Sequence, residues 1–154
     1  MNVNNLDKQI NDLVNDFNTN LIILIKYVKS TNPIKNLICA EREIMNACIM
    51  QLHDFAAIKS KSMIDSFVIH ILAKYEMEIL DGNEDFFSNE SNNDSSSNND
   101  FVEKMLRFKT VWSQFSSEEK EYIKTYMQLL CVISRGYFDF VDQKNQNKKI
   151  YESA

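Results

Sequence analysis

Turn-forming residues are scarce in this chain, whose 154 residues include two glycines and one proline. A strand-rich fold of this length needs many turns built on Gly, Pro or Asn-Gly, whereas a few long helices need almost none. A chain this long can bury about two thirds of the surface that its unfolded form exposes, which is enough for one core. The sequence therefore predicts an all-α, single-domain bundle of about five helices.

Apolar residues recur at steps of three and four, the spacing that lines one face of a helix. The first such stripe runs over residues 6–28, and Asn4 or Asn5 can cap the start of the helix. Pro33 disfavours helical backbone in the residue before it. We therefore expect the first long helix to end near Lys29.

Pro33 suits the first turn of a second helix. A third helix is expected after a corner near 56–62, where Ser60 or Ser62 can act as its cap. The predicted stripes are Ile34, Leu37, Ile38, Ile44, Met45, Cys48, Leu52 and Phe55 in the second helix, and Ile64, Phe67, Val68, Ile71, Leu72, Tyr75 and Ile79 in the third.

Two further N-terminal caps stand in the last third of the chain. Asp100 with Glu103 is expected to start a fourth helix, and Ser116 with Glu119 matches the S-x-x-E capping box for a fifth. The stripes are Phe101, Met105, Phe108 and Trp112 in the fourth helix, and Tyr122, Ile123, Tyr126, Met127, Leu130, Ile133, Tyr137 and Val141 in the fifth.

The segment 81–100 differs from the rest in composition, because it contains six carboxylates and no basic residue. Its second part, SNESNNDSSSNND, has no apolar residue. Such a segment cannot bury enough apolar surface to become ordered, so a disordered loop is predicted to interrupt a helical domain over residues 1–142. Gly136 is expected to bend or shorten the fifth helix, and residues 143–154 to form a flexible tail.

Trp112, the one tryptophan of the chain, lies just before the cap of the fifth helix. With Phe115 it is expected to fill the angle between the last two helices, its indole N–H donating to a carbonyl at a helix end. The alternative is an exposed anchor for a protein partner, because tryptophan is enriched in interface hot spots. Trp112, Phe108, Phe115 and Tyr126 are the candidates for a structural or partner-binding role.

The same region contains EDFF, a variable loop, and then FKTVW, a serine cap and IKTYMQLL. This pattern resembles a family of short helical proteins of unknown function from large nucleocytoplasmic DNA viruses. Lys124 stands where that family commonly has a second tryptophan, and residues 1–80 are unmatched. The resemblance implies a viral helical protein and no particular chemistry. The matching positions are Phe86, Phe87, Phe108, Trp112, Ser116, Lys120, Tyr126, Met127, Gln128 and Leu129.

Charge and apolar patterning exclude several partners. The net charge of −5 and the pI of about 5.1 disfavour nucleic acid and anionic membrane surfaces. The longest apolar run, LIILIKYV, is too short to cross a bilayer, and the polar first residues lack the pattern of a signal peptide. Three cysteines without CxxC spacing favour a reducing compartment. We expect a soluble protein without membrane insertion.

No residue pattern predicts a catalytic, cofactor or metal site. His53 and His70 lack the HExxH and ExxH spacings of metal-binding helices. Lys104, Arg107 and Lys109 form the densest basic cluster near the tryptophan, and such clusters are usually solvated helix surface. The sequence therefore predicts a protein that is not an enzyme.

Two functions remain after these exclusions. The first is a structural or assembly role in a virion, through contacts with other proteins of the virus. The alternative is an adaptor or host-modulating module that binds a partner helix in a groove. Both place the protein in the host cytoplasm or the virion, with a protein partner, and both leave homo-oligomer formation open.

Overall fold

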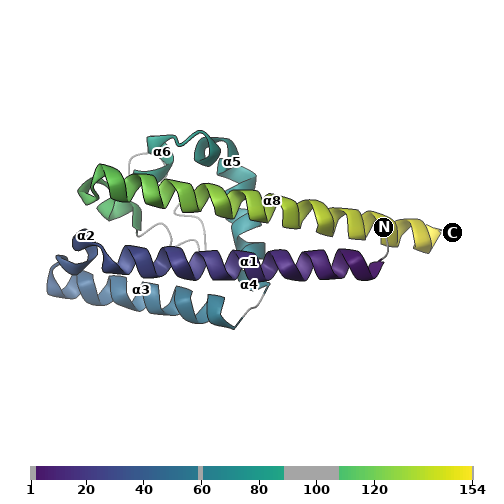
Figure 1. The fold of residues 1–154 in the computed structure, drawn as a ribbon, viewed down its shortest axis with the longest axis horizontal. Helices are drawn as coiled ribbons and strands as arrows, with labels where there is room; N and C mark the ends of the chain where they lie inside the picture. Colours follow the sequence, from purple (N-terminus) through teal and green to yellow (C-terminus); the bar gives the residue numbers. More distant parts are fainter. Residues whose placement is uncertain (1–2, 59–60, 89–107, 154) are drawn as a thin grey trace.

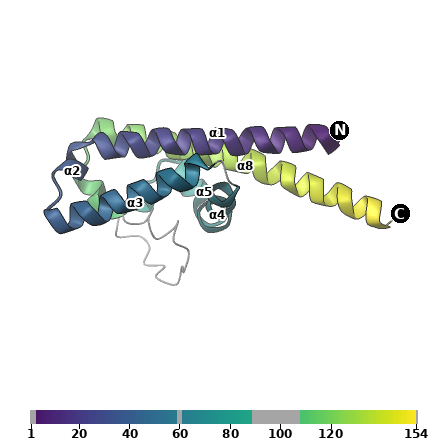
Figure 2. The same ribbon diagram turned by 90° about the horizontal axis from the view of Figure 1, so that it is seen from below.

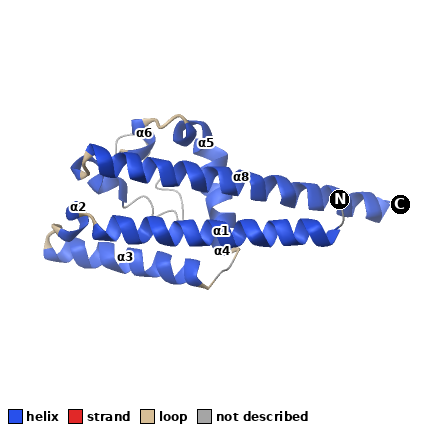
Figure 3. Cartoon of the chain, in the orientation of Figure 1, coloured by secondary structure: helices blue, strands red, loops and turns tan. Residues whose placement is uncertain are grey.

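The computed structural model describes residues 3–58, 61–88 and 108–153, and in these ranges all regular structure is helical. Three long helices, α1 (Val3–Ser30), α3 (Cys39–Ala57) and α8 (Ser117–Ser153), lie side by side, with α3 and α8 antiparallel to α1 (Figure 1). Both ends of the described chain lie at the same end of the bundle. The prediction of an all-α fold is confirmed (Figure 3).

A fourth long element crosses these helices. It consists of α4 (Ser62–Phe67), the π-helix η1 (Val68–Leu72) and α5 (Ala73–Leu80), which follow one another without a break. Figure 2 shows it end on, on the same side of the α1–α8 pair as α3. Three short helices complete the described part of the fold: α2 (Asn32–Lys35), α6 (Glu84–Phe87) and the 3₁₀-helix η2 (Phe108–Gln114). One apolar cluster joins all these elements, as a single domain requires.

The first helix ends at Ser30, as its sequence predicts, and the Thr31 hydroxyl donates to the Val28 carbonyl at 2.6 Å. Pro33 lies in the first turn of α2, also as predicted. The predicted start is wrong, since α1 already begins at Val3 and the two asparagines that follow it are inside the helix.

The predicted second helix is interrupted. A break at residues 36–38 separates α2 from α3 and lets α3 turn back along α1. The predicted stripe is also shifted, because α3 buries Met45, Cys48, Ile49, Leu52 and Ala56. Ile38, Ile44 and Phe55, which belong to the predicted stripe, are exposed. The apolar residues of α3 cover a wider arc of the helix surface than its contact with α1 can bury. The sequence alone therefore does not specify which part of this arc is buried.

The corner near 56–62 is confirmed, because α3 ends at Ala57 and α4 begins at Ser62. The predicted serine cap is wrong, because the N-cap residue of α4 is Lys61, whose side chain makes no capping hydrogen bond. Ser60 lies outside the described residues.

Residues 81–88 are not the start of a disordered loop. Gly82 adopts a φ of 69°, which a glycine accepts without strain, and the Asn83 side chain accepts a hydrogen bond from the Asp85 N–H at 2.9 Å to start α6. This helix buries Phe86 and Phe87. These two side chains supply apolar surface for the core, which the polar remainder of the segment does not have. Residues 89–100, and the predicted Asp100–Glu103 cap with its first stripe positions, lie outside the described residues.

The capping box of the last helix is confirmed. The Glu119 N–H donates to Ser116 Oγ at 3.1 Å, and the Ser116 N–H donates to Glu119 Oε1 at 2.8 Å. Gly136 does not end α8, because the helix continues to Ser153 through the predicted flexible tail. A β-carbon at Gly136 would lie 3.6 Å from Leu13 Cδ1, so the glycine lies close to α1.

Candidate functional site

The 3₁₀ backbone of η2 and the turn that follows it place three side chains on one face. A 3₁₀-helix has three residues per turn, so side chains three apart lie above one another. Lys109, Trp112 and Phe115 have this spacing, and all three line the same cavity. The sequence predicts an α-helix here, where steps of three and four would have aligned Phe108 with Trp112.

Trp112 is buried, with an exposed fraction of 5%. Its ring stacks on Phe87 with centroids 4.8 Å apart and meets Phe115 edge to face at 6.2 Å. The indole N–H donates to Glu84 Oε2 at 2.7 Å. The predicted acceptor, a helix-end carbonyl, is therefore wrong, because the side chain reaches α6 instead.

Glu84 links three elements through its carboxylate. Its other oxygen accepts a hydrogen bond from Lys124 Nζ at 2.8 Å, so α6 is joined to both η2 and α8. The hydrogen bond from Lys124, together with that from Trp112 and the positive charge of Lys124, holds the pKa of Glu84 below its usual value. Lys120 Nζ lies 5.5 Å from the Trp112 ring centroid, within range of a cation–π contact.

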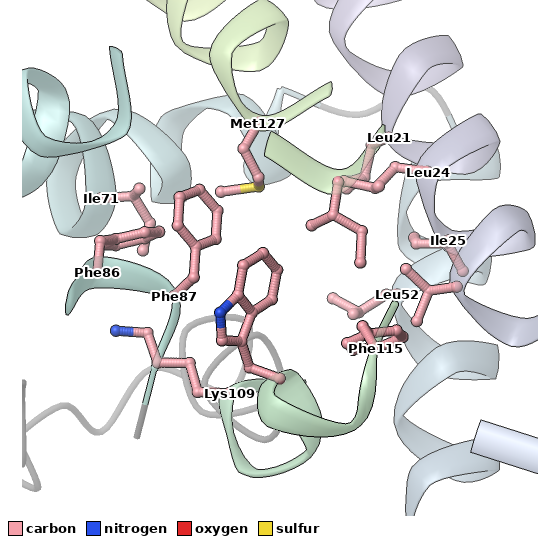
Figure 4. A pocket seen from close by; sticks show the side chains of 13 residues that line it. Leu21, Leu24, Ile25, Leu52, Ile71, Phe86, Phe87, Lys109, Phe115 and Met127 are labelled. Carbon is pink, nitrogen blue, oxygen red and sulfur yellow. The ribbon is translucent and has the colours of Figure 1, made fainter. Parts of the chain in front are cut away.

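A cavity of about 90 Å³ lies beside these rings, between α1, α3, α6, η1, η2 and α8 (Figure 4). Its walls are apolar except for one lysine. The ammonium nitrogen of that lysine has almost no accessible surface, so its aliphatic stem is the part that lines the cavity. The lining residues are Leu21, Leu24, Ile25, Val28, Leu52, Ile71, Phe86, Phe87, Lys109, Trp112, Phe115, Ile123 and Met127.

Lys109 is the charged member of this wall. Its ammonium nitrogen is buried and has no hydrogen-bond acceptor among the residues that the structure describes. Nζ lies 4.3 Å from the Phe86 ring centroid and 5.8 Å from that of Tyr75, and burial lowers the pKa of the amine. The prediction that Lys109 is solvated surface is wrong, while Lys104 and Arg107 lie outside the described residues.

The four candidate residues do not form one site. Trp112 and Phe115 meet at the cavity, whereas half-buried Tyr126 belongs to a separate stack on α8. Its ring centroid is 4.9 Å from that of Tyr122, which in turn lies 3.7 Å from Tyr27. The side chain of Phe108 lies outside the described residues.

The crossing helix is irregular where it reaches the cavity. Ile71, one of the lining residues, lies in the π-helix η1. A π-turn inside an α-helix is rare and is frequent at functional sites, because the extra residue re-aims neighbouring side chains. This irregularity, which apolar periodicity does not reveal, is a second reason to regard the cavity as a candidate site.

A second candidate lies on the surface of α3. An exposed stripe without charged residues follows steps of four and three along one face, which we call the outer stripe. Ile44, Phe55 and Ile58 are 48%, 43% and 68% exposed. The helix contacts α1, α2 and α4 with its other face, at one edge of the molecule (Figure 1). The stripe comprises Ala40, Ile44, Ala47, Gln51, Phe55 and Ile58.

Acidic residues border the outer stripe on both sides. At 100° per residue, Glu41 falls on one flank, and Glu43 and Asp54 fall on the other. All three are exposed, and the single basic residue within α3, Arg42, points away from the stripe by the same geometry. The surface is thus an uncharged, mainly apolar strip with a negative border.

Other chemistry-bearing side chains do not converge. Cys39, Cys48 and Cys131 are free thiols, and burial raises the pKa of Cys131 to about 12, far from that of a reactive thiolate. Among the described residues no group of three His, Cys, Asp or Glu side chains could hold a metal ion.

Sequence reasoning missed Lys109 and Glu84 as site residues. Lys109, Trp112 and Phe115 follow one another at steps of three residues. This spacing predicts a shared face only if the backbone is known to be 3₁₀. The signal for Glu84 was its position beside two phenylalanines in an otherwise polar segment. Both contacts join residues far apart in the chain, so no local pattern specifies them.

In the described part of the chain no helix is long and apolar enough to cross a membrane. Comparisons of the chain with protein-family models, with curated proteins and with solved structures each gave no match.

Proposed function

We propose that this protein is a non-enzymatic helical module that binds another protein through the outer stripe of α3. The observation that carries the proposal is the exposed, uncharged stripe with helical spacing. A partner helix with apolar residues at the same spacing would bury these side chains, as when the apolar faces of two helices pack together. Contiguous exposed apolar residues with a polar border are typical of protein interaction sites.

The charges around the stripe define the partner further. Glu41, Glu43 and Asp54 favour a helix whose flanks are basic. A second copy of α3 would instead bring two acidic borders together, so self-association through this face is disfavoured. The partner is therefore a different protein with a basic amphipathic helix.

The resemblance of the C-terminal third to proteins of large DNA viruses supports a virion or assembly role for this contact. In that setting the partner is another protein of the virus. The alternative, an adaptor for a host protein, uses the same surface and differs in the partner alone.

Site-specific photocrosslinking tests the proposal in the cells or virions that contain the protein. A crosslinking side chain at position 55 should give one dominant adduct with a second protein, whereas one at Met77, which is 68% exposed on α5, should give none. Phe55→Glu should abolish co-purification of that protein, and Met77→Glu is the matched control. Adducts of equal yield at both positions, or none at position 55, would contradict the proposal, as would an adduct with twice the mass of the chain.

A further inference from the structure

One polar side chain interrupts the outer stripe of α3. Gln51 is that residue, and all other members of the stripe are apolar. At 100° per residue Gln51 lies in the middle of the arc that the stripe covers, with Ala47 one turn before it and Phe55 one turn after it. Gln51 is exposed, so water can solvate its amide in the free chain.

A covered Gln51 needs hydrogen bonds from another source. A glutamine side chain has two N–H donors and one carbonyl acceptor. When a partner helix covers the stripe, these groups are removed from water. Each of them that stays without a hydrogen bond then lowers the affinity of the contact.

The stripe cannot supply these hydrogen bonds. Ala47 and Phe55, the neighbours of Gln51 along the stripe, have no hydrogen-bonding side chain. Asp54, three residues on, lies on the flank, and its side chain is 72% exposed, which places it at the solvated rim of such a contact. The hydrogen bonds to a covered Gln51 therefore have to come from the partner helix.

The surroundings of Gln51 select the kind of side chain that can face it. A carboxylate would be repelled by the acidic border, which consists of Glu41, Glu43 and Asp54. A lysine or arginine would have its charge desolvated in the middle of the strip, whereas at the rim it can pair with the acidic border and stay solvated. A neutral amide both donates to and accepts from another amide. An asparagine or glutamine is thus the complement of Gln51.

On the basis of the function proposed above, we propose that Gln51 determines the specificity of the outer stripe, by selecting a partner helix with an asparagine or glutamine at the facing position. A single polar residue in an apolar helix contact lowers affinity and raises specificity, because an apolar residue at the facing position leaves the polar group unpaired. Helices that match the stripe in spacing and charge alone are therefore rejected.

Two synthetic peptides with the sequence pattern of a basic amphipathic helix test this role. Both have leucines at the spacing of the stripe and lysines on the two flanks, and they differ in one central residue, which is asparagine or leucine. In isothermal titration calorimetry the whole chain should bind the asparagine peptide more tightly, and Gln51→Leu should bind the leucine peptide more tightly. The ratio of the two affinities should differ about tenfold or more between the two chains, the effect of one unpaired buried amide.

Two further variants complete the experiment. Gln143→Leu, at an exposed glutamine of α8 outside the stripe, is the matched control and should leave the ratio unchanged. Phe55→Glu should abolish binding of both peptides, as expected if they occupy the stripe. Leucine is a good helix former, so Gln51→Leu should leave α3 intact.

The outcomes separate the role of Gln51 from the function of the stripe. If both peptides bind at the stripe with the same ratio in the original chain and in Gln51→Leu, the proposed function stands and the role of Gln51 is overturned. A ratio that Gln143→Leu changes as much would also overturn that role. Peptides that do not bind, or whose binding survives Phe55→Glu, would overturn both.

Discussion

The two parts of α8 differ in how they are covered. Between Ser117 and Tyr137 the helix contacts α6 through Lys124 and η2 through Lys120, and α8 also packs against the crossing helix. This part buries seven side chains: Ile123, Met127, Leu130, Cys131, Ile133, Ser134 and Tyr137. None of residues 138–150 is buried. In Figure 1 this second part extends along α1 and past its start, away from the crossing helix.

One continuous helix thus combines two sources of order. The first part is fixed by burial of large side chains, which contributes most of the free energy of folding. The second part depends on helix propensity, on pairing with α1 and on surface contacts such as Lys144 with Asp7 at 2.5 Å. We expect the first part to open only on global unfolding and the second to open locally.

The largest effect is expected at Trp112. Trp112→Ala removes a buried ring that stacks on Phe87, and should lower the free energy of unfolding by about 3–5 kcal/mol. That is a large part of the roughly 5–15 kcal/mol typical of a domain, so the variant should be marginally folded. Chemical denaturation followed by circular dichroism measures the loss.

Phe138→Ala is the matched control in the second part, where the side chain is 42% exposed. Its effect should stay within about 0.5 kcal/mol, as for most surface substitutions. If Trp112→Ala leaves the denaturation midpoint unchanged, the tryptophan is a partner anchor instead of a structural residue. A blue-shifted emission that acrylamide quenches poorly is expected from the intact chain.

The next effect should appear at the end of the covered part. The Tyr137 hydroxyl donates to Asp65 Oδ1 at 2.5 Å and joins α8 to α4. Tyr137→Phe keeps the buried ring and removes this hydrogen bond, so it should destabilise the protein by about 1 kcal/mol. Urea denaturation resolves a difference of this size, and an unchanged midpoint would mean that water replaces the bond without loss.

The sequence specifies the covered core better than the contacts that build the site. Scarce turn residues, helical periodicity and the Ser116 capping box correctly predict an all-α fold, the end of α1 and the start of α8. These are local signals. Helix content follows from them because capping and periodicity act within a few residues.

Choices between equivalent local patterns could not be predicted. The apolar arc of α3 is wide enough to bury either of two faces, and the tertiary contact with α1 selects the one that contains Met45 and Ile49. The same limit applies to η2, where the bond from Trp112 to Glu84 accompanies a 3₁₀ backbone. Composition alone predicts that a lysine such as Lys109 is exposed to solvent. Its ammonium nitrogen is buried because of this backbone, which composition does not reveal.

A smaller, pH-dependent effect is expected at the ion pair of the covered part. The pKa of Glu84 is lowered, so its contribution to stability is present above the ordinary value of 4.5 and is lost as pH falls through the folded-state pKa. The carboxylate is about half exposed, so solvent screens the pair and Glu84→Gln should destabilise by about 0.5–1 kcal/mol at pH 7. The difference between the variant and the original chain should shrink as pH falls below 4.5; a difference that stays constant would assign the effect to packing.

The smallest effect is expected at the ion pair of the second part. Lys144 and Asp7 are both nearly half exposed, so ordering two long side chains offsets most of their attraction. Lys144→Ala should change the free energy of unfolding by no more than about 0.5 kcal/mol, and hydrogen exchange should show faster local opening beyond Tyr137. Lys124→Ala is the matched substitution in the covered part, where 12% of the lysine side chain is exposed, and its effect should be larger. Equal effects of the two substitutions on global stability would mean that both parts of α8 unfold as one unit, and the distinction between them would fail.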